Sequence, residues 1–281
     1  MGRKIALVTD STSDLTADYV QENNIHVMPL KVVYRDREFL DRVEIQPQEI
    51  YDKLEEEIPS TSTPSVGEVT DFFARLIKEG YEEIISIHLS SGLSGTVNTV
   101  RLAAEHFPDI KIKVIDSKSI SMGTGLLVQQ AADFIKKGMN LESIVAKVHE
   151  IRENLSVIFI VKTLEYLKKG GRIGYVSATM GSLLDLKPII AVNKEGKYFT
   201  LAKVRGRKKS LEKILTLAKE AAEKQRLKMI VMHGDALEEA KYIFHELTKS
   251  GKFKELKIGE VGPVIGVHTG PGVVGIAFHP A

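Results

Sequence analysis

The chain has 281 residues, of which 43% are hydrophobic, so it can bury the core of one large domain or of two modest ones. Its 39 basic and 37 acidic residues give a formal net charge of +2, which provides no global field to attract nucleic acid or an anionic membrane. Because cysteine is absent, disulfides, thiolate nucleophiles and zinc–thiolate sites are excluded, and a reducing compartment fits.

The first half of the chain alternates between short apolar runs and amphipathic segments. Pro29 interrupts one apolar run, which should therefore lie near a sheet edge or bend. Ser65 and Glu68 form a capping box that starts a helix. We expect, in order, strand 4–8, helix 15–22, strand 25–33, helix 48–57, helix 66–77, strand 84–89, a helix after Thr96, strand 111–115, helices 124–136 and 141–153, and strand 157–161.

The second half of the chain has a different texture, in which a hairpin at Glu195-Gly196 joins two strands. We expect a short helix at 164–167, strands 188–192 and 198–204, a helix after the basic run 205–209, strand 229–232, helix 237–249, and strands 256–261 and 273–278. We place the boundary near residue 160, with domains 1–160 and 161–281 and strand 157–161 closing the first. The fold class is α/β: an N-terminal parallel-sheet α/β/α domain and a smaller C-terminal α/β domain with a mixed sheet.

The stretch 84–96 is an apolar strand that ends abruptly in serines and glycines. Helical spacing begins again at Val97, so Ser94 should lie just before a helix N-terminus. The backbone N–H groups there have no partner within the helix, and the helix dipole favours negative charge. This stretch therefore indicates an anion site.

Similar hydroxyl-rich loops recur at the ends of several predicted strands. A single loop of this kind usually only caps a helix. Here four of them, at 10–14, 61–65, 90–96 and 116–119, should meet at one edge of one sheet. Hydroxyl groups and helix N-termini can hold a carboxylate or a phosphate without a metal ion.

Several familiar motifs do not fit. Residues 270–275 match G-x-G-x-x-G, but they contain a proline and are followed by too few residues for a dinucleotide fold. A Walker-type phosphate loop is absent, and the eight histidines form no metal-ligand pattern, so we expect no metal and no cofactor. No stretch approaches the roughly twenty apolar residues of a membrane span. The first apolar run is also too short for a signal peptide, so we expect a cytoplasmic protein.

A few charged residues stand out individually. His88 lies near the end of a buried strand and is best explained as a histidine satisfied by a hydrogen bond. His268 lies between glycines in a predicted loop, where structural and functional roles have about equal weight. Arg205 directly follows a strand, and Arg172 lies in a Gly-Gly turn that allows close backbone approach.

Taken together, these motifs resemble the DegV family, the fatty-acid-binding subunits of bacterial fatty acid kinase. The resemblance rests on segments spread over nearly the whole chain: 9–14, 61–65, 89–96, 114–118, 170–173 and 268–270. It implies a two-domain protein that buries one long-chain fatty acid in a tunnel in the N-terminal domain. Thr61 and Ser94 would hold the carboxylate, and Asp10, Ser11, Ser62, Ser91 and Gly95 would belong to supporting loops.

The resemblance also implies a set of partners. Arg172, Arg205 and His268 match positions linked to acyl-phosphate formation or to contact with the kinase. A separate ATP-dependent kinase subunit would phosphorylate the bound acyl group, and an acyltransferase would accept the acyl-phosphate for phospholipid synthesis. The chain would then have no catalytic residue of its own, would bind no nucleic acid, and would touch membranes at most transiently.

Two alternatives remain at this stage. Ser94 and His268 could form the centre of a stand-alone hydrolase or phosphotransferase, although the G-x-S-x-G spacing of a nucleophile elbow is missing. The basic run 205–209 could contact nucleic acid. The near-neutral net charge of the chain argues against this alternative. The preferred chain length, unsaturation or branching of the fatty acid and the oligomeric state cannot be derived from one sequence.

Overall fold

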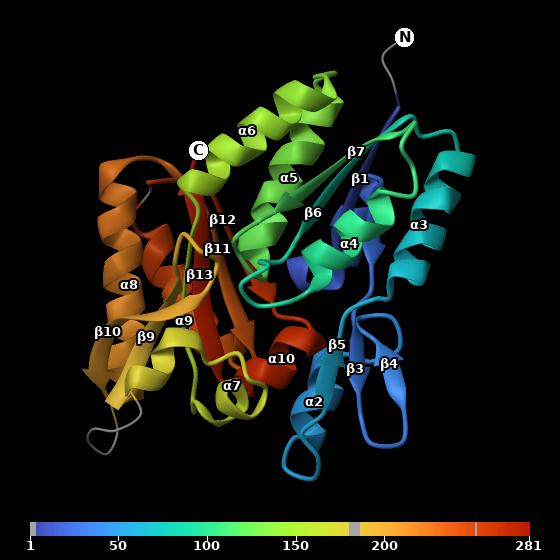
Figure 1. Cartoon of the computed structure of the whole chain (residues 1–281). Helices are drawn as coiled ribbons and strands as arrows, with labels where there is room; N and C mark the ends of the chain where they lie inside the picture. Colours follow the sequence, from blue (N-terminus) through green and yellow to red (C-terminus); the bar gives the residue numbers. More distant parts are fainter. Residues whose placement is uncertain (1–3, 180–185, 251) are drawn as a thin grey trace.

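The computed structural model describes residues 4–179, 186–250 and 252–281. Its β-strands form three sheets, and its main body is a stack of helical and sheet layers (Figure 1). The first sheet is parallel, with the order β2 (Ile25–Met28), β1 (Ile5–Asp10), β6 (Glu83–His88) and β7 (Lys111–Asp116). The predicted parallel sheet in the N-terminal half is therefore confirmed.

Helices cover both faces of the parallel sheet. On one face lie α3 (Val66–Lys78) and α4 (Thr96–Ala104), whose apolar side chains share a core with β1 and β6. On the other face lies α5 (Met122–Lys136), which packs against α6 (Leu141–Glu153). The predicted capping box of Ser65 and Glu68 is present at the start of α3.

The second sheet has six strands and is mixed. Its order is β10 (Tyr198–Arg205), β9 (Leu186–Val192), β8 (Ser156–Ile160), β13 (Val273–Pro280), β11 (Leu227–Gly234) and β12 (Phe253–Glu260). Only β11 and β12 are parallel neighbours, joined through α9 (Leu237–Thr248), and the β9–β10 hairpin is confirmed. Helices α8 (Arg207–Lys224) and α9 cover its outer face. The mixed sheet agrees with the expected fold class.

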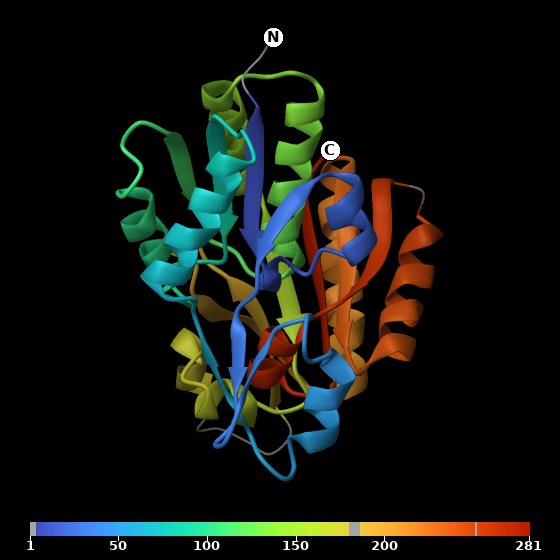
Figure 2. The same ribbon diagram turned by 90° about the vertical axis from the view of Figure 1, so that its right-hand side faces the viewer.

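The two large sheets share one hydrophobic core. Along β13, Val274 and Ile276 point toward α8 and α9, whereas Val273 and Ala277 belong to the same core cluster as Ile85 of the parallel sheet. This alternation is the two-residue period of a strand buried on both faces. Helix α5 contacts β1, β6 and β13, and Figures 1 and 2 show it between the sheets.

Two strand predictions need correction. Strand β8, expected to close the first half, hydrogen-bonds to β9 and β13 and so belongs to the six-stranded sheet. The expected strand 25–33 is two strands, because the chain leaves the parallel sheet after Met28 and continues past Pro29 as β3 (Lys31–Val33). The division into domains near residue 160 stays a prediction.

The third sheet is small and antiparallel, with β3 between β4 (Glu38–Leu40) and β5 (Ser60–Ser62). The remaining elements are η1 (Ser11–Ser13), α1 (Ala17–Glu22), α2 (Pro47–Lys53), α7 (Glu165–Lys169), η2 (Gly174–Thr179) and α10 (Pro263–Thr269). Thr61 therefore lies in a strand rather than a loop, and His268 lies in a helix rather than a loop. Helix α10 packs against β3, β5, α2 and α7.

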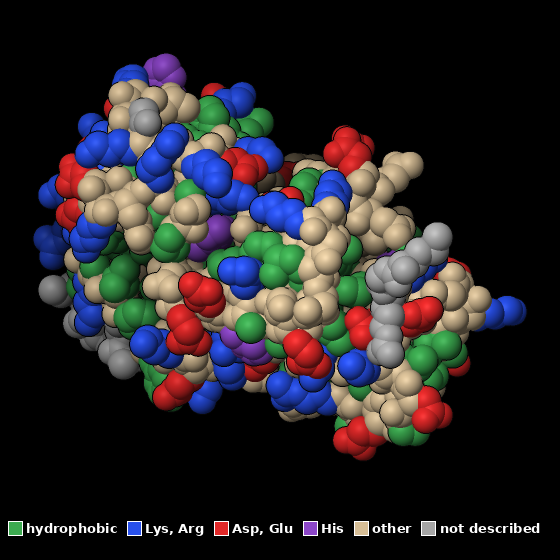
Figure 3. Space-filling view, turned by 90° about the horizontal axis from the view of Figure 1, so that it is seen from above, with side chains coloured by type: hydrophobic (Ala, Val, Ile, Leu, Met, Phe, Trp, Pro, Cys, Tyr) green, Lys and Arg blue, Asp and Glu red, His purple; other side chains and the backbone are tan. Residues whose placement is uncertain are grey.

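The surface is electrostatically mixed. Figure 3 shows basic and acidic side chains interspersed over the upper face, in agreement with the formal charge of +2. None of the described helices is both long enough and apolar enough to cross a membrane. The cytoplasmic location stays a prediction.

The shared core makes a first testable prediction about α5. Leu126 is fully buried in α5, so Leu126→Ala should lower the free energy of unfolding by about 2–5 kcal/mol through lost burial and a residual cavity. The matched change Leu102→Ala, at a position 53% exposed on α4, should cost less than about 0.5 kcal/mol. Urea denaturation of both variants measures the difference, and equal losses would contradict the central position of α5.

Candidate functional site

Four of the residues singled out in the sequence meet around one small cavity. Thr61, Ser94, Arg172 and His268 all line it, although they come from β5, the β6–α4 loop, the turn after α7, and α10. The cavity has a volume of about 30 Å³, and its other walls are mostly apolar: Leu30, Leu89, Leu93, Ile120, Tyr198, Val264, Ile265 and Thr269. We call it the head-group cavity.

One polar contact joins two residues that line this cavity, Thr61 and His268. The Thr61 Oγ1 atom lies 2.8 Å from Nε2 of His268, across 207 positions of the sequence. Among the described residues, the buried Nδ1 of His268 has no hydrogen-bond partner. The contact links the three-stranded sheet to α10 and so closes one side of the cavity.

His268 is neutral at physiological pH. Its pKa is lowered to about 4, mainly by burial and also by the nearby positive charge of Arg172. Gly170 makes this packing possible, because a Cβ atom at that position would lie 2.2 Å from Nδ1 of His268. A neutral imidazole offers one donor and one acceptor, so it can relay a hydrogen bond without forming an ion pair.

Ser94 lies one residue before the N-cap of α4, as the sequence predicts for an anion-binding loop. Its Oγ accepts a hydrogen bond from the Thr96 N–H at 3.3 Å and lies 2.9 Å from the Thr96 hydroxyl. The loop is anchored from beneath by Asp10, whose carboxylate accepts the Leu89 N–H at 3.1 Å. This bond fixes the start of the loop that carries Ser94.

Arg172 supplies the positive charge of the cavity. Its Nη1 donates to the Gly170 carbonyl at 2.7 Å, and its Nε donates to the Leu93 carbonyl at 3.3 Å. These two bonds tie the turn after α7 to the loop that carries Ser94. A guanidinium has five N–H donors, so further donors remain for an anion.

The other predicted residues lie outside the head-group cavity. Arg205 is exposed at the end of β10, whereas Tyr198 at the start of that strand lines the cavity, about 23 Å away at 3.3 Å per residue. The remaining members of the set stabilise loops or strands: Ser11 accepts the Leu30 N–H, Ser62 pairs with Lys31 in the small sheet, Ser91 donates to Asp116, and Gly95 is the N-cap of α4.

An apolar cavity of about 20 Å³ adjoins the head-group cavity, and the two share Ile120, Tyr198, Ile265 and Thr269. It lies against the six-stranded sheet, and its further walls come from β8, β11 and β13, from the residue after β12 and from the residue before α5: Ser121, Val157, Phe159, Met232, Val261, Val273 and Gly275. We call it the inner cavity. Sequence reasoning missed these residues, because their only signal is the apolar pattern common to every buried strand.

A serine–histidine–aspartate chain also occurs in the core, where Ser86 Oγ lies 2.6 Å from His88 Nε2 and His88 Nδ1 lies 2.9 Å from Asp10. All three residues are fully buried, so a substrate cannot reach Ser86. His88 is thus a hydrogen-bonded core histidine, as predicted. His268, for its part, contacts Thr61 rather than Ser94, and this contact weakens the hydrolase alternative.

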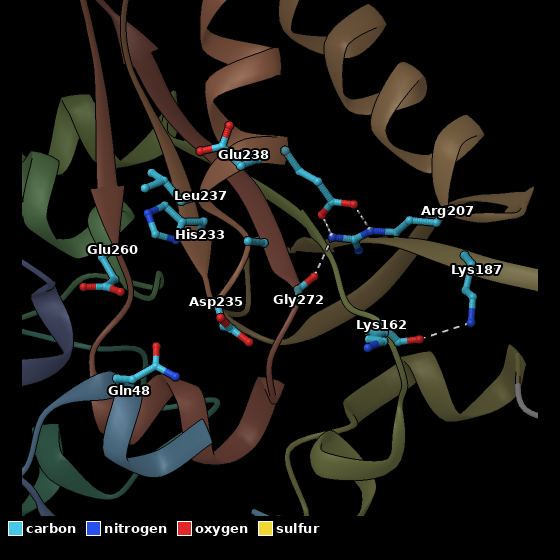
Figure 4. Close-up of a pocket in the computed structure, with 12 residues that line it drawn as sticks. Gln48, Lys162, Lys187, Arg207, His233, Asp235, Leu237, Glu238, Glu260 and Gly272 are labelled. Atoms are coloured by element: carbon cyan, nitrogen blue, oxygen red, sulfur yellow. Dashed lines mark hydrogen bonds and ion pairs between the residues drawn. The ribbon is translucent and has the colours of Figure 1, made fainter. Parts of the chain in front are cut away.

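A larger cavity, of about 760 Å³, lies elsewhere, at the N-terminus of α9 (Figure 4). Arg207 is held there by Glu239 and by the Gly272 carbonyl. Figure 4 shows Glu238 and Glu260 on the side opposite Lys162 and Lys187, and the site is open and charged, which does not suit an apolar ligand. In the described part of the chain, no group of three or more His, Asp or Glu side chains could hold a metal ion.

Comparison with known proteins decides the family. The family model described as "Uncharacterised protein, DegV family" matches residues 4–281. The chain belongs to the DegV family. One DegV domain-containing protein, from Clostridium acetobutylicum, is 44% identical over 275 residues, which cover 98% of each chain. The resemblance drawn from the sequence motifs is thereby confirmed at the level of the family.

Solved structures of DegV proteins share the fold. A DegV family protein from Thermus thermophilus, described by its fatty acid binding, is 36% identical with a TM-score of 0.93, covering 99% of this chain and 100% of that one. DegV from Bacillus subtilis, described as a fatty acid binding protein, is 33% identical with a TM-score of 0.92 and full coverage of both chains. A stearic acid-binding protein from Eubacterium ventriosum is 29% identical with a TM-score of 0.90, covering 99% and 98%.

The buried histidine of this DegV protein makes a prediction about pH. Since His268 takes up a proton at about pH 4 in the folded protein but near 6.5 in the unfolded chain, its contribution to stability is complete above pH 6.5 and is lost as the pH falls toward 4. The unfolding free energy of the unmodified protein should fall between pH 6.5 and pH 4, and His268 should account for on the order of 3 kcal/mol of that fall. In His268→Asn this part of the fall should be absent. Urea denaturation at pH 7.5 and 4.5 measures it.

The control for this prediction is His245→Asn, at an exposed position on α9. This variant should keep the pH dependence of the unmodified protein. If His268→Asn also keeps it, the neutral state of His268 is contradicted.

Proposed function

We propose that this protein binds a long-chain fatty acid with its carboxylate in the head-group cavity and its tail along the inner cavity. The observation that carries the proposal is the contact between these two cavities, one ringed by hydroxyl groups and the other apolar. Fatty acid binding by the similar proteins of Thermus thermophilus and Bacillus subtilis supports it. The tail would then lie against the six-stranded sheet rather than in the N-terminal half alone.

The tail supplies most of the binding energy in this proposal. Burial contributes roughly 0.8 kcal/mol per methylene, so a sixteen- or eighteen-carbon chain contributes on the order of 10 kcal/mol before the costs of binding. The two cavities measure about 30 and 20 Å³, comparable to the share of one water molecule in the liquid, about 30 Å³. The side chains of the walls must therefore move apart as the tail enters.

The head group would be held by hydrogen bonds. With Nε2–H of His268 donating to Thr61, the Thr61 hydroxyl is free to donate its own proton to the carboxylate, and Ser94 donates from the other side. Hydrogen bonds to a charged acceptor are shorter and stronger than neutral ones. Arg172 adds positive charge at the same end.

We further propose that a separate ATP-dependent kinase phosphorylates the bound carboxylate, and that the protein then delivers acyl-phosphate to an acyltransferase for phospholipid synthesis. An open cavity of about 330 Å³ leads to the head group and shares Leu93, Arg172 and Tyr198 with the head-group cavity. Lys197 also lines it. This opening offers a phosphoryl donor a route to the carboxylate past two positive charges, which would stabilise the added phosphate.

The first test concerns the carboxylate. Thr61→Val and Ser94→Ala should each weaken binding of palmitate or oleate by about 10- to 100-fold, because a hydrogen bond to a charged group contributes about 1.5–3 kcal/mol. Native mass spectrometry of the freshly purified protein and titration with fluorescent fatty acid measure retention and affinity. Ser62→Ala, on the neighbouring position of the same strand, is the control and should bind normally. A protein that never contains or binds fatty acid would refute the proposal.

The second test separates binding from phosphorylation. Arg205 lies too far from the head-group cavity to touch the ligand, so Arg205→Ala should leave fatty acid affinity within about twofold. Acyl-phosphate formation in the presence of the kinase should fall by about tenfold, equivalent to ~1.4 kcal/mol of lost contact. Arg226→Ala is a matched control, since Arg226 is exposed at the opposite end of the same sheet. Equal loss of lipid binding in Thr61→Val and Arg205→Ala would contradict this division of roles.

A further inference from the structure

Helix α10 forms a wall of the head-group cavity and is held at its start by carboxylates from distant parts of the chain. Its N-cap residue, Gly262, has no side chain to cap it. Instead the Gly262 N–H donates to Asp14 at 2.8 Å, and the Val264 N–H donates to Asp41 at 3.3 Å. One turn further along, the same helix carries His268.

The two carboxylates differ in how completely they are paired. Asp14 forms an ion pair with Arg42 at 3.0 Å and accepts a hydrogen bond from Ser121, in addition to the Gly262 N–H. Asp41 is 1% exposed, and within the described ranges its Oδ2 atom has no hydrogen-bond partner. Its Oδ1 atom accepts a hydrogen bond from the Val264 N–H of α10, and the Ser11 hydroxyl lies close enough to the carboxyl group to lower its pKa. Burying a carboxylate that is only partly hydrogen-bonded lowers the stability of the fold. Where a folded protein retains such a group, a functional role is one explanation.

The surrounding backbone is strained as well. Three residues, Asp14, Arg42 and Ser121, have positive φ values of 55°, 61° and 54°. Residues other than glycine rarely adopt such values. Ser121 also lines the inner cavity. Strained residues of this kind persist only where the surrounding contacts hold them, and they cluster at functional sites.

We propose that Asp41 is a positioning residue for His268: its carboxylate holds the first turn of α10 and thereby sets the contact between His268 and Thr61. This inference rests on the proposed function, in which His268 helps to bind the carboxylate of the fatty acid through Thr61. Its structural content can be tested without any ligand.

The charge state of Asp41 provides the measurement. The pKa of Asp41 is raised to about 6: burial is the largest cause and the nearby charge of Asp14 acts in the same direction, whereas the hydrogen bonds from Ser11 and the Val264 N–H and the charge of Arg42 oppose it. The carboxyl group therefore loses its charge as the pH falls through about 6, and a neutral carboxyl is a weaker acceptor for the Val264 N–H. His268 itself takes up a proton only near pH 4, so a change in its environment near pH 6 reports Asp41.

The experiment follows the imidazole signals of the full chain by NMR from pH 7.5 to 5, with the His268 signal assigned by its loss in His268→Asn. We expect an inflection near pH 6 that disappears in Asp41→Asn and persists in the control Asp133→Asn, which removes a partly exposed carboxylate from α5. At pH 7.5, Asp41→Asn should also bind oleate about 3- to 10-fold more weakly.

A wild-type protein without the inflection, or an Asp41→Asn protein that keeps it, would overturn the proposal. If Asp41→Asn does not fold, Ser11→Ala decides: loss of the Ser11 hydroxyl, which lowers the pKa of Asp41, should move the inflection to higher pH, and an unmoved inflection counts against the proposal. Failure of all variants to bind oleate would refute fatty acid binding while the NMR result still decides the role of Asp41.

Discussion

The burial of α5 between the two large sheets is the constraint on which the structure depends. Eleven of its residues are buried, and it has no solvent face along its first three turns. Two glycines permit this close packing: a Cβ on Gly123 would lie 2.4 Å from the Val157 side chain, and one on Gly125 would lie 2.5 Å from the Ser13 carbonyl. The helix therefore fixes the separation of the sheets. Of the two residues that precede it, Ile120 lines both cavities and Ser121 lines the inner cavity.

Because the sheets pack around α5, the residues of the site come from several different elements of the fold. Loops from the parallel sheet bring Ser94, the small antiparallel sheet brings Thr61, and α10 brings His268. The Thr61–His268 contact spans most of the chain, so the head-group cavity exists only after both halves have packed on α5. Formation of the site therefore requires the packed core, in which one cluster includes residues of both large sheets.

Much of the fold could be predicted from the sequence because it depends on local patterns. The capping box of Ser65 and the apolar stripe of α6 mark their helices directly. The pairing of β8 could not be predicted in this way, because a buried strand has the same apolar pattern in either sheet. The placement of β5 failed for a related reason, since a strand of three residues is too short to show a period.

The sequence allowed most residues of the site to be predicted, but not how they are arranged in space. Thr61, Ser94, Arg172 and His268 carried chemical signals, in the form of hydroxyl loops, a glycine turn and an isolated histidine, and they meet in one cavity. His268 was predicted to lie in a loop because glycines flank it. It lies in α10, which begins at Pro263, a residue type that favours the first position of a helix. Asp14 was noticed only as the end of loop 10–14 and Asp41 not at all, since their role depends on contacts with positions more than 200 residues away.

The chemistry of the head-group cavity bears on what a bound carboxylate could do there. An ion pair with a buried lysine would neutralise the carboxylate and lower its reactivity, whereas hydroxyl donors hold it while leaving its charge in place. Arg172 keeps its positive charge but already donates to the Gly170 and Leu93 carbonyls, and His268 is neutral, so of these two side chains only Arg172 is charged. Under the proposed function, a carboxylate held in this way keeps a nucleophilic oxygen for attack on a phosphoryl group, and the positive charges at the opening stabilise the phosphate once it has been transferred.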